Sequence, residues 1–192
     1  MEIKIRAAVP ADSPAIAEII QMALHEEGCE ALAGGKERLP RLQQLFTALC
    51  RMENSQYSYR NTLIAEDEAG NIAGAIVSYD GARLHELRRA FIAKANEMLG
   101  YDLREEDFDD ETSPDEIYLD SMAVYPAFRG RGLARRLMNA AIDSHKDAGK
   151  QFGLLCAPGN DNAYALYERL GFTEVGMRPF AGIDMHHMTR KR

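Results

Sequence analysis

The segment 117–134 constrains the fold more than any other part of the chain. An apolar run from Ile117 to Val124 has the length and composition of a buried strand, and a proline follows at Pro126. A turn rich in glycine and arginine comes next, and apolar residues at helical spacing begin at Leu133. A strand that passes through a tight turn directly into a helix predicts an α/β or α+β domain built on one sheet.

The same turn is a candidate anion site. The first turn of a helix offers unpaired N–H groups and a partial positive charge of about +0.5. Glycines let the backbone approach an anion, and arginines add positive charge; the residues are Arg129, Gly130, Arg131, Gly132, Arg135 and Arg136. A dinucleotide fingerprint would need Gly or Ala in place of Arg135, and the sequence has no Walker Gly-Lys-Ser/Thr. A pyrophosphate is the natural ligand, and a tight turn without a ligand is the alternative.

Hydrophobic periodicity predicts the other elements. We expect strands near 2–9, 62–65, 72–77, 117–124, 152–156, 172–177 and 183–188, and helices near 13–24, 39–50, 84–99, 133–142 and 163–170. The glycine-containing stretch 28–35 is expected to interrupt the first two helices. These elements predict a single mixed α/β domain over residues 1–192.

Charge and composition exclude several classes. The net charge is −7, and residues 105–116 carry eight carboxylates, so the rest of the chain sums to +1. A nucleic-acid-binding protein would show a basic face instead. Residues 1–9 interleave charged and apolar residues unlike a signal peptide, and no apolar run approaches the roughly 20 residues of a membrane span. We therefore expect a cytoplasmic protein that binds neither nucleic acid nor membrane, with three free cysteines.

Metal and nucleophile signatures are weak. His186 and His187 are adjacent in a predicted strand, so they point to opposite faces and do not predict a shared metal ion. Cys156 lies in a predicted strand, where a small buried residue is the expected role rather than a nucleophile.

A second motif follows about thirty residues after the turn. Residues 160–172 read as a capped helix, a glycine stop and a new strand. The pair R-x-x-G-x-A (Arg129, Gly132, Ala134) and N-x-x-A-x-x-L-Y-x-x-x-G-F (Asn160 to Phe172) resembles the GCN5-related N-acetyltransferase (GNAT) family. The resemblance runs from residue 2 to about 188 and is specific between 117 and 172. It implies a central mixed sheet of six to seven strands flanked by helices, with strands 117–124 and 152–156 splayed apart.

The resemblance also implies acetyl-coenzyme A as acyl donor, without a metal. The implied cofactor-binding residues are Met122, Ala123, Val124, Arg129, Gly130, Arg131, Gly132, Leu133, Ala134, Asn160, Ala163 and Tyr167. The strand residues would bind the pantetheine arm like an added strand, and the turn would hold the pyrophosphate. The N–H of Met122 would face the thioester oxygen, and such a donor contributes about 3–4 kcal/mol.

Two residues are candidate catalytic groups. The resemblance places Tyr167 as the general acid for the departing thiolate, and a phenol of pKa about 10 suits that role; a core aromatic is the alternative. Asp120 shares its expected strand face with Tyr118, Met122 and Val124. It is a candidate base, because deprotonating a lysine-like amine at pH 7 costs about 4.6 kcal/mol. A structural aspartate, with water as the base, is the alternative.

About 35 residues, 81–116, separate two strands that a short turn joins in simple relatives. This 81–116 segment could form part of the acceptor wall and attract a cationic amine, or it could be a solvated, mobile loop. His25, Glu26 and Glu27 are further candidates for acceptor contact. The expected function is acetyl transfer to a primary amine of a small molecule. A protein or peptide N-acetyltransferase and a non-catalytic acyl-CoA-binding module stay open, as does a homodimer.

Overall fold

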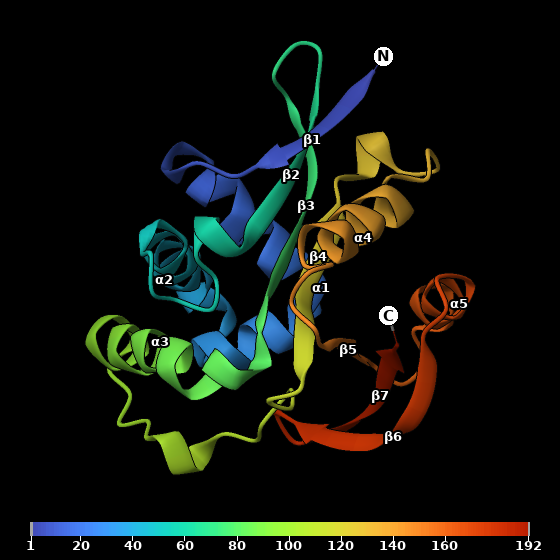
Figure 1. Cartoon of the computed structure of the whole chain (residues 1–192). Helices are drawn as coiled ribbons and strands as arrows, with labels where there is room; N and C mark the ends of the chain where they lie inside the picture. Colours follow the sequence, from blue (N-terminus) through green and yellow to red (C-terminus); the bar gives the residue numbers. More distant parts are fainter. Residues whose placement is uncertain (1, 192) are drawn as a thin grey trace.

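The computed structural model describes residues 2–191, and within them seven strands form one sheet (Figure 1). The sheet order is β1-β2-β3-β4-β5-β7-β6. The strands are β1 Ile3–Ala7, β2 Thr62–Asp67, β3 Ile72–Asp80, β4 Glu116–Val124, β5 Gln151–Cys156, β6 Thr173–Phe180 and β7 Ile183–Arg190. The helices are α1 Ser13–Ala33, α2 Leu39–Arg51, α3 Leu84–Leu99, α4 Leu133–Ser144 and α5 Asp161–Arg169. The expected mixed sheet flanked by helices is confirmed.

The sheet is mixed because one neighbouring pair runs parallel. β1 to β4 form an antiparallel meander, and β5, β7 and β6 form a second antiparallel group. β4 and β5 join the two groups in parallel, with α4 as the crossover between them. The hairpin turn predicted at Gly70 is present, with Gly70 at φ 85°.

Helices cover both faces of the sheet (Figure 1). Apolar residues of α1, α2 and α3 form one core with β2 and β3, centred on residues such as Ile19, Phe46 and Val77. On the other face, α4 buries Leu137 and Met138 against the sheet. Helix α5 packs against this second core through partly buried apolar side chains. These two apolar cores are divided by the sheet, and a smaller third cluster joins Tyr79 and Tyr118 to Leu84 and Leu87 of α3.

The first helix differs from the sequence expectation. It continues through Gly28 to Ala33 and breaks at His25, whose φ of 61° and ψ of 168° are non-helical. The helix ends at Gly34 in the left-handed conformation with φ 78°. The predicted interruption at 28–35 was thus placed too late, because a helix tolerates Gly28 and the break occurs at a residue with a full side chain.

The 81–116 segment packs against the protein through helix α3 and through two buried carboxylates. Helix α3 occupies its first half and buries Arg88, which is 2% exposed. In the acidic half, Glu111 is 3% exposed and Glu116 is 1% exposed. The interpretation of this stretch as a mobile, solvated loop is wrong for Glu111 and Glu116, because their carboxylates are bound by Arg88, Thr112 and His187.

Three further findings apply to residues 2–191. In that range no helix is long and apolar enough to cross a bilayer. Nor do three or more of its His, Cys, Asp or Glu side chains gather in a way that could hold a metal ion. All three cysteines are free and buried.

Candidate functional site

The ladder between β4 and β5 ends early. The pairs are Glu116 with Gln151, Ile117 with Phe152 and Tyr118 with Gly153, and both strands then continue to Val124 and Cys156. Beyond these three pairs, within the described residues, β5 pairs with β7 and no longer with β4. β4 and β5 therefore part in the middle of the sheet, as the sequence resemblance implied.

Backbone donors of β4 face the parting. The N–H of Tyr125 donates to the carbonyl of Ala73 on β3 at 2.9 Å. Successive backbone groups of a strand point to alternate sides, so the N–H of Ala123 also faces β3. The N–H groups of Met122 and Val124 then face the opposite side, where β4 and β5 separate. The carbonyl of Val124 also points there and accepts from Nε of Arg129 at 3.0 Å.

The turn before α4 has the conformation that glycine favours. Gly130 and Gly132 have φ values of 76° and 69°, both in the left-handed region. Gly132 is the N-cap of α4, and its carbonyl accepts the bond from the N–H of Arg136 at 3.1 Å. The N–H groups of Leu133 and Ala134 precede that bond, so helix geometry leaves them without an intrahelical acceptor. The turn thus presents a helix terminus with N–H groups available for hydrogen bonding beside the end of β4.

Helix α5 lies close to the end of β5. Asn160 caps it by accepting from the N–H of Ala163 at 3.3 Å. The Tyr167 ring packs edge-on to Phe172, with centroids 6.2 Å apart. Burial, and next the nearby thiol of Cys156, raise the pKa of Tyr167 to about 12, above the value of about 10 expected from sequence. The hydroxyl therefore stays protonated across the physiological range.

Cys156 shows the features of an inert thiol. The side chain is buried, and burial raises the pKa of its thiol. Its sulfur lies 3.8 Å from the carbonyl oxygen of Ala157 and 3.9 Å from that of Asn160. A thiolate nucleophile is not favoured in these surroundings.

Asp120 sits in an irregular part of β4. The register shifts between the pair Ile76–Met122 and the pair Ser78–Leu119, so β4 bulges at Asp120 and Ser121. The hydroxyl of Ser121 donates to Oδ1 of Asp120 at 2.6 Å. The side chain is partly exposed. Burial is the main cause that raises the pKa of Asp120 to about 7.

The bulge corrects one expectation about Asp120. Tyr118 packs with Tyr79 and with residues of α3, whereas Met122 and Val124 belong to the core under α4. The predicted common face of Asp120 with Met122 and Val124 is therefore wrong, because one extra residue in the bulge reverses the alternation after Ser121. The sharing of a face with Tyr118 fits the structure, since Tyr79, whose ring lies 5.7 Å from that of Tyr118, also influences the pKa of Asp120.

The two candidate catalytic side chains lie on opposite faces of the sheet. Asp120 is on the face covered by α3, beside Tyr79. Tyr167 is on the face covered by α4 and α5. The parting of β4 and β5 lies between these faces, so a molecule placed in it has a proton acceptor on one side and a proton donor on the other.

Sequence reasoning missed the groups that act on Asp120, which are Gln56, Tyr79, Ser121 and the like-charged Glu111. Gln56 and Tyr79 lie far from Asp120 in sequence, and no local motif marks them. His25, Glu26 and Glu27 lie at the break in α1 and are exposed.

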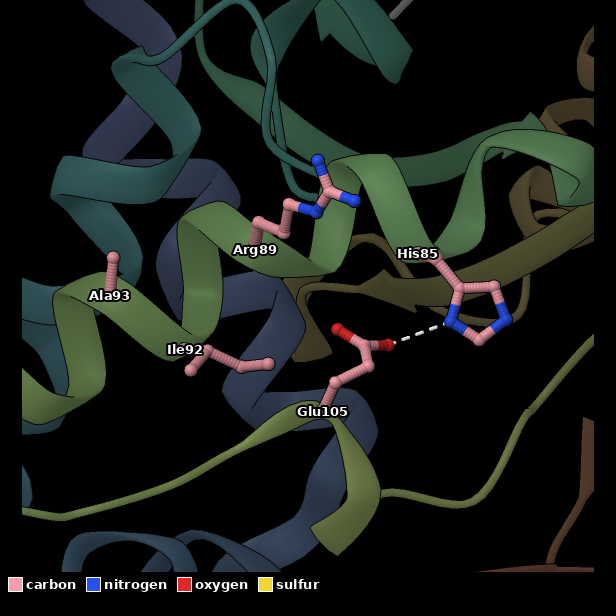
Figure 2. A pocket seen from close by; sticks show the side chains of 5 residues that line it. All are labelled: His85, Arg89, Ile92, Ala93 and Glu105. Carbon is pink, nitrogen blue, oxygen red and sulfur yellow. Dashed lines mark hydrogen bonds and ion pairs between the residues drawn. The ribbon is translucent and has the colours of Figure 1, made fainter.

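A hollow of about 330 Å³ lies elsewhere, on the outer side of α3 (Figure 2). It is lined by His85, Arg89, Ile92, Ala93 and Glu105, and a bond of 2.7 Å joins His85 to Glu105. None of the candidate catalytic or cofactor-binding residues lines it, so we place the site at the parting of β4 and β5 and not in this hollow.

A seven-stranded mixed sheet with one parted parallel pair, flanked by a glycine-rich helix terminus, defines the class: this is a GNAT-type acetyltransferase fold. A family model agrees. The acetyltransferase (GNAT) family matches residues 20–172, and the chain belongs to this family.

Individual relatives support the same assignment. The chain is 36% identical over 83 residues to the N-alpha-acetyltransferase RimI of Mycobacterium tuberculosis, covering 41% of this chain and 51% of that protein. It is 28% identical over 105 residues to the [ribosomal protein bS18]-alanine N-acetyltransferase of Haemophilus influenzae, covering 55% and 66%. The chain thus spans about half to two thirds of these relatives. A solved acetyltransferase structure superposes with a TM-score of 0.78 at 28% identity, covering 98% of both chains.

Proposed function

We propose that this protein is an acetyl-CoA-dependent N-acetyltransferase that transfers acetyl directly to a primary amine. One observation carries the proposal: the parted strands separate a carboxylate with a pKa of about 7 from a protonated phenol on the opposite face. Membership of the GNAT family supports acetyl-CoA as the donor.

The cofactor-binding residues fit such a donor. Acetyl-CoA would supply an activated thioester carbonyl. The turn at Arg129 to Ala134 would hold the diphosphate on helix N–H groups, with Gly130 and Gly132 permitting close approach. The N–H of Met122 would face the thioester oxygen and stabilise the negative charge that develops on it, and Val124 would pair with the pantetheine arm. Ala123, Leu133, Asn160 and Ala163 would shape this site.

Proton transfers would use the two faces. With a pKa of about 7, Asp120 is half ionised at neutral pH and can accept the proton that an ammonium must lose before attack. Tyr167 stays protonated and can donate to the departing thiolate. Because its pKa is about 12, it is a weaker acid than the sequence suggested, so proton donation would accompany bond breaking rather than precede it.

For the acceptor we propose a small-molecule primary amine. The packed 81–116 segment supports it, since bulk beside Asp120 leaves less room for an open peptide groove. A protein terminal amine is the second candidate, favoured by the names of the two curated relatives, which act on N-alpha groups and on a ribosomal protein alanine.

Two assays test the proposal. Calorimetry should detect binding of coenzyme A, and thiol release from acetyl-CoA should occur with members of a panel of small primary amines and peptides with free N-termini. Turnover with peptides alone would select the second candidate. Binding without any turnover would identify a non-catalytic acyl-CoA module, and failure to bind coenzyme A would overturn the proposal.

A further inference from the structure

The 81–116 segment contains a buried ion pair with no part in the chemistry described so far. Nη2 of Arg88 on α3 donates to Oε2 of Glu111 at 2.5 Å, and the two side chains are 2% and 4% exposed. Nη1 of Arg88 also binds the carboxylates of Glu105 and Asp110 at 3.1 Å and 3.2 Å, but these are 37% and 49% exposed. The carboxylate of Glu111 thus forms a buried ion pair with the guanidinium of Arg88 inside the protein.

The other oxygen of Glu111 faces the partners of Asp120. Its Oε1 accepts from the hydroxyl of Tyr79 at 3.2 Å and from Nε2 of Gln56 at 3.3 Å. Tyr79 and Gln56 also act as donors towards the carboxyl of Asp120, where they oppose the rise in its pKa. A tyrosine hydroxyl has one proton, so Glu111 and Asp120 compete for it. Gln56 turns its amide NH2 towards the carboxylates, and its buried Oε1 has no hydrogen-bond partner among the described residues.

We propose that Glu111 is a positioning residue for Asp120: Arg88 holds its carboxylate so that Glu111 shares the donors Tyr79 and Gln56 with Asp120 and opposes the negative charge of Asp120. This inference rests on the proposed function, in which Asp120 takes the proton of the amine. A second carboxylate in one site favours protonation of whichever carboxyl lacks a cation. Because Arg88 neutralises Glu111, the proton goes to Asp120.

The other groups facing Asp120 agree with this division of charge. Burial raises the pKa of Tyr57, Tyr79 and Tyr118 well above 10, so these rings stay neutral. Ser121 donates a neutral hydrogen bond. The cations near this group of side chains are Arg88, which binds Glu111, and Arg178 of β6, which binds Ser113 and the carbonyl of Asp110.

A purely structural role for the ion pair is the competing explanation. Arg88 would then only fasten the 81–116 segment to α3, and any of its carboxylate partners would serve equally. Glu105 provides the matched control, since its side chain binds the same guanidinium at 3.1 Å and also contacts His85. Glu105→Gln weakens the anchor without touching the shared donors, whereas Glu111→Gln removes the charge beside them.

The test is a carbon-13 NMR titration of the Asp120 carboxyl in the full-length protein. Glu111→Gln should lower the pKa of Asp120 by about one unit, because a nearby like charge disappears. Tyr79→Phe should raise the pKa, because Asp120 loses a donor that favours its ionised form. Glu105→Gln should leave it unchanged. Tyr79→Phe carries the test alone if Glu111→Gln does not fold.

Kinetics supply a second readout. In Glu111→Gln the acid limb of the kcat profile should move to lower pH by the same amount, while Glu105→Gln keeps the wild-type limb. The inference would be overturned if the pKa of Asp120 were the same in the wild type, in Glu111→Gln and in Tyr79→Phe. Equal shifts in Glu111→Gln and Glu105→Gln would also overturn it. Failure of the wild type to acetylate any amine would instead reject the proposed function, since the NMR titration needs no turnover.

Discussion

Burial shifts the pKa values of Asp120 and Tyr167 in the same direction, although their proposed roles, proton acceptor and proton donor, are opposite. Burial raises both pKa values, to about 7 for the carboxyl and about 12 for the phenol. The carboxyl thereby becomes a useful base at neutral pH, whereas the phenol is fixed in its acid form. One physical cause at two residues therefore supports the two opposite proton transfers of the proposed reaction.

The Tyr167 hydroxyl can be tested without disturbing the core. We expect Tyr167→Phe to lower kcat about 100-fold or more, because the ring still packs on Phe172 but the proton donor is lost. Thiol release from acetyl-CoA measures the change. Tyr164→Phe is the control on the same helix, because its hydroxyl donates to Glu174 at 2.9 Å on the surface. A wild-type rate in Tyr167→Phe would remove the general-acid role.

Asp120 also affects stability in a pH-dependent way. Its folded-state pKa of about 7 exceeds the unfolded value, so the folded state holds a proton that the unfolded state has released between about pH 4 and pH 7. Stability from this group is complete below that range and is lost as pH rises through it.

Asp120→Asn should therefore weaken the pH dependence of the free energy of unfolding. Between pH 5 and pH 8, the free energy of unfolding of the wild type should fall by about 2–4 kcal/mol more than that of the variant. Urea unfolding at both pH values measures the difference, and all other titrating groups cancel in the comparison. Equal pH dependence in the two proteins would show that Asp120 titrates normally.

Among the secondary-structure elements, the turn before α4 has a conformation that requires glycine and a proposed role in binding acetyl-CoA. Gly132→Ala should cost about 1 kcal/mol of stability, because its φ of 69° strains any residue with a Cβ, and it should raise KM for acetyl-CoA. Gly149→Ala is the matched control, since Gly149 has φ 73° and open space around it but lies after α4. The control should lose similar stability in thermal unfolding and keep the wild-type KM. If the two variants had the same KM for acetyl-CoA, the turn would have no role in binding the cofactor.

Local patterns predicted most elements, and they failed where distant residues decide. Alternation and helical spacing gave β4, α4 and α5 within a few residues, because each has a regular apolar face. The bulge at Asp120 left no mark in the sequence, since β4 is covered on both faces and shows no clear alternation that a change of phase would interrupt. The acidic stretch read as solvated because its neutralising cation, Arg88, lies on α3 and not beside it.

Across the whole molecule, a short parallel ladder joins two antiparallel groups of strands. A ligand bound in the parting would add contacts to both groups and stabilise the folded state by mass action. We expect coenzyme A to slow amide hydrogen exchange in β5 and α5 as well as in β4. Pantetheine, which lacks the nucleotide and diphosphate, should protect the strands less. Protection limited to β4 would contradict binding between the strands.

Placing Asp120 and Tyr167 on opposite sheet faces also limits the order of events. An amine that arrives beside Asp120 does not have to cross the space of the nucleotide at α4, so both substrates can reside on the enzyme together. Steady-state kinetics should then give intersecting double-reciprocal lines, the signature of a ternary complex, with no acetylated enzyme. Parallel lines would indicate a double-displacement scheme. They would mean that the amine and acetyl-CoA do not reside on the enzyme together.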